Sequence, residues 1–135
     1  LTRNLEIPNA NAVGELVLRS KEGEVSFNGV RPVVDNVLRL KVGGVPSGEK
    51  AMLRGKLKAY HVKSEFFKLS DPNFAYGEGI VSLKYEGDDI EGYKILRYDE
   101  KKRKFIELET EVDEMNQRAT AKTIELGVFV VAKKR

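Results

Sequence analysis

The chain has no cysteine and no tryptophan, one histidine and two methionines. The lack of cysteine excludes a disulfide framework, a cysteine-ligated metal site and a cysteine nucleophile, and a single histidine excludes a metal site built from several histidines. No apolar run approaches the roughly 18 residues of a membrane-spanning helix, and no signal peptide is recognisable. Carboxylates, lysine, arginine, tyrosine and one histidine are therefore the groups left to carry chemistry.

Charge is abundant, because 33% of the residues are charged, with 24 Lys+Arg against 21 Asp+Glu. The excess of lysine and glutamate over uncharged amides is typical of thermophile proteins. At 135 residues the chain is long enough for one domain with its own core. It begins at Leu1 without an initiator methionine, so we expect a piece of a longer protein. Residues 1–13 are expected to form a linker or a loosely attached edge segment, and residues 14–135 a single domain.

Apolar and polar residues alternate with a period of two along much of the chain, and helical spacing never lasts three turns. The alternation is clearest over residues 37–42 and 53–60. Further strands are expected at residues 15–19, 24–27, 80–85, 93–99, 104–108, 118–123 and 127–133. About nine short strands separated by turns predict an all-β fold, an antiparallel β-sandwich of the Ig-like kind. Residues 80–83 and 128–132 are apolar on both faces and are expected in the middle of a sheet.

Several motifs follow one another in a fixed order in the second half of the chain. They are Phe74-Ala75-Tyr76-Gly77, residues 80–85, Ile95-Leu96-Arg97-Tyr98-Asp99, Phe105-Ile106-Glu107-Leu108, Val112-Asp113 with Asn116 and Ala119-Thr120-Ala121, and Gly127-Val128-Phe129-Val130-Val131. This ordered set resembles the ZU5-like β-sandwich modules of microbial cell-surface proteins. Such modules occur in S-layer-type and adhesin-type proteins and attached to peptidoglycan metallopeptidases.

The resemblance implies an extracytoplasmic, non-catalytic structural or interaction module that spaces or docks a neighbouring domain or an envelope polymer, as in adhesion. Its implied partners are other domains of the same polypeptide, other surface proteins, an anionic envelope polymer or a polysaccharide. Neither a cofactor nor nucleic acid is expected. Some ZU5-related domains cleave themselves at a His-Phe-Ser motif, but this chain has Thr123-Ile124-Glu125-Leu126-Gly127 there, which implies no self-cleavage. Phe105 stands in place of the usual tryptophan.

A basic sheet face is the candidate binding surface. If the strands at residues 37–42 and 53–60 are neighbours, five cations share one outward face: Arg39, Lys41, Arg54, Lys56 and Lys58. Like charges facing one another destabilise a sheet, so this face requires acidic neighbours such as Glu15 and Glu24, or a bound polyanion. No aromatic residues alternate with these cations, which argues against single-stranded nucleic acid as the ligand.

Enzymatic use of His61 is the main catalytic alternative. The alternation turns His61 inward at the end of its strand, which is typical of a structural histidine. An enzyme would need Asp71 or Asp99 within hydrogen-bonding reach of the imidazole. Nothing resembles a nucleophile elbow or an oxyanion turn, so we assign no catalytic residue.

Two charged loops allow a binding and a structural interpretation. Glu86, Asp88, Asp89 and Glu91 crowd one loop, and carboxylates with backbone carbonyls are ligands that Ca²⁺ prefers. A solvated turn explains the same residues. The basic run at residues 101–104 is flanked by strand residues and is expected to be a solvated hairpin turn rather than a nucleic-acid motif.

Carbohydrate binding is the alternative function. Sugar-binding sandwiches stack exposed aromatic rings on their ligands, and the available tyrosines are Tyr60, Tyr76, Tyr85, Tyr93 and Tyr98. The lack of tryptophan argues modestly against this function.

Overall fold

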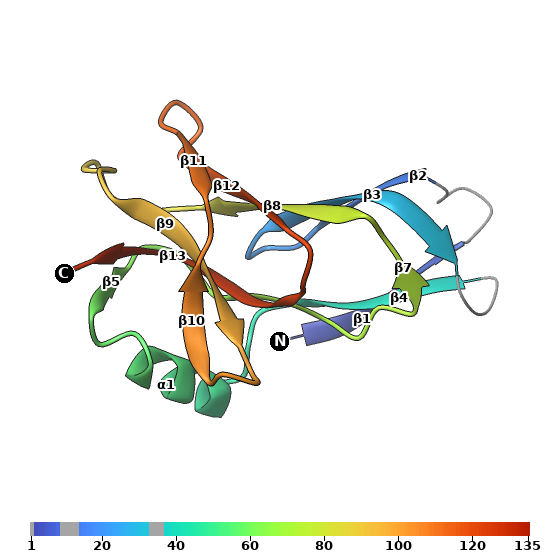
Figure 1. Cartoon of the computed structure of the whole chain (residues 1–135), viewed down its shortest axis with the longest axis horizontal. Helices are drawn as coiled ribbons and strands as arrows, with labels where there is room; N and C mark the ends of the chain where they lie inside the picture. Colours follow the sequence, from blue (N-terminus) through green and yellow to red (C-terminus); the bar gives the residue numbers. More distant parts are fainter. Residues whose placement is uncertain (1, 9–13, 33–36) are drawn as a thin grey trace.

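The structure is a computed structural model that describes residues 2–8, 14–32 and 37–135. Two antiparallel sheets pack face to face, and one short helix lies against the outside of the first sheet (Figure 1). The expected all-β antiparallel sandwich is confirmed. The expectation of about nine strands was too low, because the described residues form thirteen.

The first sheet has seven strands in the order β1-β4-β6-β13-β9-β10, and β5 also pairs with β13. Their bounds are β1 Thr2–Pro8, β4 Val37–Gly43, β5 Tyr60–Val62, β6 Phe67–Ser70, β9 Tyr93–Asp99, β10 Lys104–Glu107 and β13 Gly127–Lys134. Of the segment at residues 1–13, residues 2–8 form the edge strand β1, which pairs with β4 along its whole length. Residues 9–13 lie outside the described part.

The second sheet has six strands in the order β11-β12-β8-β3-β2, and β7 pairs with β3. Their bounds are β2 Gly14–Arg19, β3 Glu24–Pro32, β7 Phe74–Ala75, β8 Glu78–Lys84, β11 Thr110–Asp113 and β12 Arg118–Thr123. The expected strand at residues 24–27 continues to Pro32 through Gly29. The φ of +62° at Gly29 favours glycine, and an added Cβ would lie 3.2 Å from the Gly77 nitrogen.

The strand expected at residues 53–60 is wrong. Helix α1 covers Ser47–Gly55, and a turn follows over residues 56–59. Leu53 and Leu57 are both buried, whereas Ala59, which the alternation placed on the same face, is exposed. A spacing of four residues brings two side chains to one face of a helical path as well as to one face of a strand, so the pair did not distinguish them.

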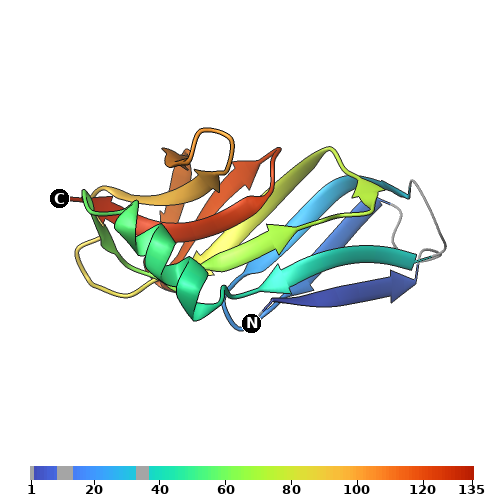
Figure 2. The same ribbon diagram turned by 90° about the horizontal axis from the view of Figure 1, so that it is seen from below.

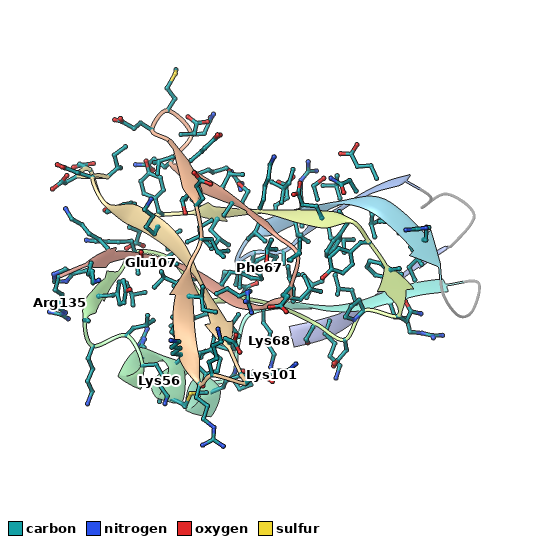
Figure 3. The ribbon with its side chains drawn as sticks, in the orientation of Figure 1. Lys56, Phe67, Lys68, Lys101, Glu107 and Arg135 are labelled. Atoms are coloured by element: carbon teal, nitrogen blue, oxygen red, sulfur yellow. The ribbon has the colours of Figure 1, made fainter. Side chains whose placement is uncertain are left out.

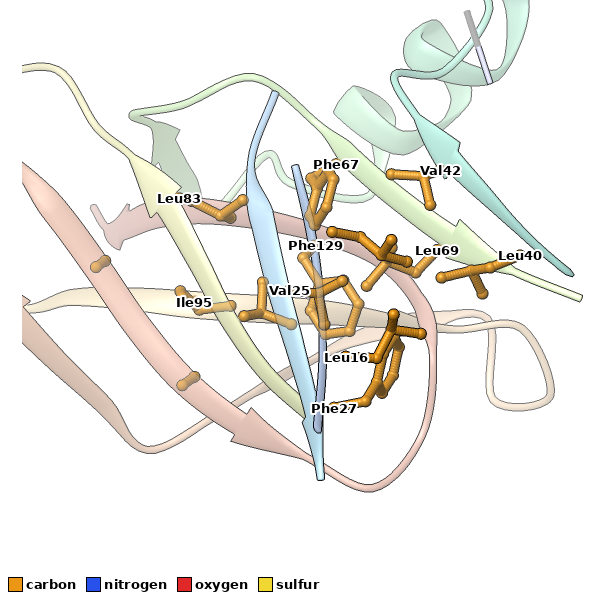
Figure 4. Packing of buried hydrophobic residues seen from close by; sticks show 14 of the residues in the cluster. Leu16, Val25, Phe27, Leu40, Val42, Phe67, Leu69, Leu83, Ile95 and Phe129 are labelled. Atoms are coloured by element: carbon orange, nitrogen blue, oxygen red, sulfur yellow. The ribbon is translucent and has the colours of Figure 1, made fainter. Parts of the chain in front are cut away.

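The larger apolar cluster fills the space between the sheets. Phe27, Phe67 and Phe129 are fully buried there, and Figure 4 shows them packed among valine and leucine side chains from both sheets. Burial of a side chain of this size contributes about 1.5–3 kcal/mol.

A second, smaller cluster lies between α1 and the outer face of the first sheet. Figure 2 shows α1 lying across β13. Alternate residues of β13 serve the two clusters, since Phe129 points between the sheets and Val130 packs with Leu53 on the helix side. The two doubly apolar strands, β8 and β13, do lie in the middle of their sheets, as predicted. Within the described residues, no helix is long and apolar enough to span a membrane.

Candidate functional site

The basic sheet face is not assembled as expected. Arg39 and Lys41 lie on β4, but Arg54 belongs to α1, and Lys56 and Lys58 lie in the turn after it. The neighbours of β4 in the sheet are β1 and β6. The Lys41 ammonium pairs with the Asp71 carboxylate at 3.1 Å. The five cations therefore do not share one face of a sheet, because three of them are carried by a helix and a turn.

Two of these cations instead enter a cleft of about 1070 Å³ beside β5. The β2–β3 turn, the end of α1, β5 and the residues after it, the end of β8 and the end of the chain all contribute to its walls. We call it the cationic cleft, after the six cations that line it: Lys21, Arg54, Lys58, Lys63, Lys84 and Arg135. Figure 3 shows Arg135 at one end of the molecule, well apart from Lys101 in the β9–β10 turn.

Backbone hydrogen bonds hold the walls of the cationic cleft in place. The Lys63 amide donates to the Val131 carbonyl at 2.8 Å, and the Lys63 carbonyl accepts from the Glu86 amide at 2.8 Å. The two backbone hydrogen bonds of Lys63 therefore link β13 of the first sheet to the segment that follows β8 in the second sheet. The Arg135 amide donates to the Ala59 carbonyl at 2.8 Å, which fixes the C-terminal end of β13 against the α1–β5 connection.

Positive charge in the cationic cleft is only partly balanced. Three carboxylates also line it: Glu22, Glu65 and Glu86. Glu65 lies 3.9 Å from Lys50, and Glu22 accepts a hydrogen bond from the Ser20 hydroxyl at 3.1 Å. None of the six cations makes an ion pair with any residue in the described part of the chain. The Lys63 ammonium lies over the Tyr93 ring, 6.0 Å from its centroid, and the cleft offers its cations, which have no carboxylate partner within the described residues, to an anion from solution.

His61 is exposed on β5, and its expected inward orientation is wrong. It faces both the cationic cleft and an adjoining hollow of about 420 Å³, which Lys133 and Lys134 also line. The acids considered as its catalytic partners have other contacts. Asp71 pairs with Lys41, and Asp99 accepts hydrogen bonds from the amides of the turn that follows it. Both acids line a different hollow, so the structure does not bring His61 and either acid together.

The acidic loop at residues 86–91 does not gather its carboxylates around one point. Asp89 pairs with Lys133 at 3.1 Å and accepts from the Glu91 amide at 3.4 Å. The hydrogen bond from Lys133 is the main cause that lowers the pKa of Asp89. Across residues 2–8, 14–32 and 37–135, no group of three or more histidine, aspartate or glutamate side chains is arranged to hold a metal ion. The calcium interpretation of Glu86, Asp88, Asp89 and Glu91 therefore lacks a preformed site.

The tyrosines do not form an exposed platform for sugars. Tyr85, Tyr93 and Tyr98 are buried, and Tyr85 meets Tyr93 edge to face at 5.2 Å. Tyr60 and Tyr76 are half-buried, and their hydroxyls donate to the Glu107 carboxylate and the Ile124 carbonyl. Tyr85, Tyr93 and Tyr98 pack in the two apolar clusters and Tyr60 and Tyr76 pack against them, so two of the five rings keep part of their surface exposed, and carbohydrate binding stays a prediction.

Sequence reasoning missed four of the six cations in the cationic cleft: Lys21, Lys63, Lys84 and Arg135. They lie at strand ends and turns far apart in the chain, so no local spacing connects them. These residues become neighbours only through the order of the strands in the two sheets, which the spacing of residues in the sequence does not show.

No protein-family model and no curated protein matches the chain. The ZU5-like resemblance and the cell-surface location stay predictions. The geometry of the cationic cleft is therefore the main support for any function.

Proposed function

We propose that this domain is a non-catalytic interaction module of a larger cell-surface protein, and that its cationic cleft binds an anionic polymer of the cell envelope. One observation carries the proposal: six cations from distant parts of the chain line one cleft, and none makes an ion pair within the described residues. The resemblance to ZU5-like modules supports the extracytoplasmic location. In this role the domain spaces or docks the rest of its protein relative to the envelope.

The chemistry of the cleft favours a polymer of repeated anionic groups. Four of the six cations are lysines, whose ammonium groups are compact charges on flexible stems that accept anions in many geometries. Leu57, Tyr60, Val62 and Tyr85 supply the sizeable apolar or aromatic side chains of the lining, and Leu57 and Tyr85 are themselves buried. An acidic protein partner would need a larger exposed apolar centre for its hot spots.

The test compares two triple variants that remove the same charge. Lys58→Gln, Lys63→Gln and Lys84→Gln together remove three charges from the cationic cleft. Lys101→Gln, Lys102→Gln and Lys104→Gln remove three exposed charges from the β9–β10 turn and the first residue of β10. Binding of long-chain polyphosphate and of polygalacturonate is measured by titration calorimetry at several salt concentrations.

We expect the cleft variant to bind polyphosphate at least about tenfold more weakly. We also expect the slope of log K against log salt to fall by about three, because each phosphate-contacting lysine contributes about one. The turn variant should bind like the wild type. Equal weakening by both variants would show that only net charge matters and would contradict a specific cleft. If polyglutamate bound more tightly than either polymer, the ligand of the cleft would be an acidic protein instead of an envelope polymer.

A further inference from the structure

Arg97 is the one charged side chain among the buried residues of the described chain. It lies on β9 between Leu96 and Tyr98, which pack toward α1, so the alternation turns Arg97 to the opposite face, toward the space between the sheets. A charge in such a place is costly unless hydrogen bonds compensate for its lost hydration. The hydrogen bonds that compensate for the burial of Arg97 must therefore be identified.

The guanidinium of Arg97 has one hydrogen bond to protein within the described residues, from Nη2 to Glu125 Oε2 at 3.0 Å. A guanidinium carries five N–H donors and can bind a carboxylate through two parallel bonds. The Arg97 side chain is 10% exposed, whereas that of Glu125 is 67% exposed. Glu125 therefore takes one of the five N–H donors of Arg97, and the Glu125 side chain is itself largely exposed to solvent.

The backbone around Glu125 is held independently of Arg97. The Thr123 hydroxyl donates to the Glu125 carbonyl at 2.6 Å, and the Glu125 amide donates to that hydroxyl at 3.3 Å. The Tyr76 hydroxyl donates to the Ile124 carbonyl at 3.0 Å, and burial raises the pKa of Tyr76, so this donor keeps its proton at neutral pH. The Glu125 side chain can therefore swing away without releasing the loop that carries it.

Two hollows meet at Arg97, Ile124 and Glu125. The smaller, of about 210 Å³, is also lined by Glu78, Leu108 and Lys122, and the larger, of about 460 Å³, has an acidic rim. Neither shares a lining residue with the cationic cleft.

The smaller hollow is the side from which an anion would approach. With Glu125 turned away, the cations Arg97 and Lys122 face the single carboxylate of Glu78 there. The larger hollow carries Asp71, Asp99 and Glu100 against Arg97 and Lys101, which repels an anion. Leu108 and the 74% exposed Ile124 offer apolar contact to the rest of a ligand.

We propose that Arg97 anchors a second binding site, which recognises the carboxylate of a small organic acid or a peptide, and that Glu125 occupies this site when the ligand is absent. The ligand carboxylate takes two N–H bonds from the guanidinium where Glu125 takes one. Glu125 acts as an internal competitor, because a carboxylate on a short tether has an effective concentration in the millimolar range or above.

The experiment is an amide NMR titration with acetate replacing chloride at constant ionic strength, following Arg97, Ile124 and Glu125. We expect weak binding by the wild type and a dissociation constant about tenfold lower in Glu125→Gln, because the competitor has lost its charge. Glu114→Gln, which removes an exposed carboxylate in the β11–β12 turn, is the matched control and should behave like the wild type.

A double variant, Arg97→Gln with Glu125→Gln, removes both charges and leaves no buried cation unpaired, so it is the variant suited to test the anchor in a folded domain. Acetate should not shift its amides. A Glu125→Gln domain that binds no tighter than the Glu114→Gln control, or binding that survives in the double variant, would overturn the proposal. To distinguish a peptide from a small acid, the same NMR titration is carried out on the Glu125→Gln variant with an N-acetyl dipeptide. Tighter binding than acetate supports a peptide terminus, weaker binding supports a small acid, and binding of the dipeptide amide would overturn carboxylate recognition.

Discussion

The cationic cleft and the Arg97 site present positive charge in opposite ways. In the cleft, five of the six cations are exposed and Lys63 is half-exposed, and none has an ion-pair partner within the described residues. Arg97 is buried and paired with Glu125. Exposed cations keep their hydration and can meet a polyanion in many arrangements, whereas a buried guanidinium recognises one planar carboxylate in one geometry. The same charge therefore supports a diffuse, salt-sensitive surface in one place and a small, directional site in the other.

Helix α1 is the element that most clearly distinguishes the two sites. It contributes to the wall of the cationic cleft and contributes no residue to the hollows at Arg97. Ala51→Pro removes a backbone hydrogen bond in the interior of α1, and we expect it to lower the free energy of unfolding by about 3 kcal/mol. Affinity for polyphosphate should fall with it. Urea denaturation and the polyphosphate titration measure both effects.

Ser47→Pro is the control for that substitution, since proline is tolerated in the first turn of a helix and Pro46 already has the extended conformation that a following proline favours. It should leave stability close to that of the wild type. If Ala51→Pro were equally harmless, residues 47–55 would not be helical in solution and the expected strand at residues 53–60 would regain support.

The contrast between α1 and the strands shows what the sequence could predict. Strands β9 and β12 have the bounds expected from the sequence, and in β12 the period of two runs over all six residues, which is a strong signal. Strands β5, β7 and β11 have two to four residues, too few for any period to show. Helix α1 was missed because Leu53 and Leu57 fit both periods.

Neither candidate site could be predicted from the sequence, for two different physical reasons. The cationic cleft is assembled from turns and strand ends, so its residues become neighbours only through the strand order. Arg97 lies in an alternating strand beside Leu96 and Tyr98, where an arginine normally marks the solvent face. Both faces of β9 are covered here, one by α1 and one by the other sheet, and alternation cannot indicate that.

Alanine substitution should distinguish the two kinds of cation by stability. Arg97→Ala removes the buried stem, which lies against Gly127, and we expect a loss of about 2 kcal/mol in the free energy of unfolding. Lys84→Ala removes an exposed cation of the cleft and should change stability by less than about 0.5 kcal/mol. Urea denaturation at one salt concentration compares them. Equal losses in the free energy of unfolding would mean that the cleft cations stabilise the fold, which would contradict their assignment to ligand binding.

The Asp89–Lys133 pair beside His61 is an intermediate case, an ion pair at 3.1 Å whose acid is 79% exposed, and it should give the smallest effect. The hydrogen bond from Lys133, followed by that from the Glu91 amide, holds the pKa of Asp89 below its usual range. A folded-state pKa below the unfolded value of about 3.9 stabilises the fold above that pH, and the contribution is lost as the pH falls through the folded-state pKa. We therefore expect Asp89→Asn to lower the Tm slightly at pH 6 and the difference from wild type to vanish toward about pH 2. Asp88→Asn, which removes a neighbouring carboxylate outside this pair, is the control, and calorimetric scans across that pH range make the comparison. A Tm difference for Asp89→Asn that stays constant with pH would show that the pair does not stabilise the fold through its charge.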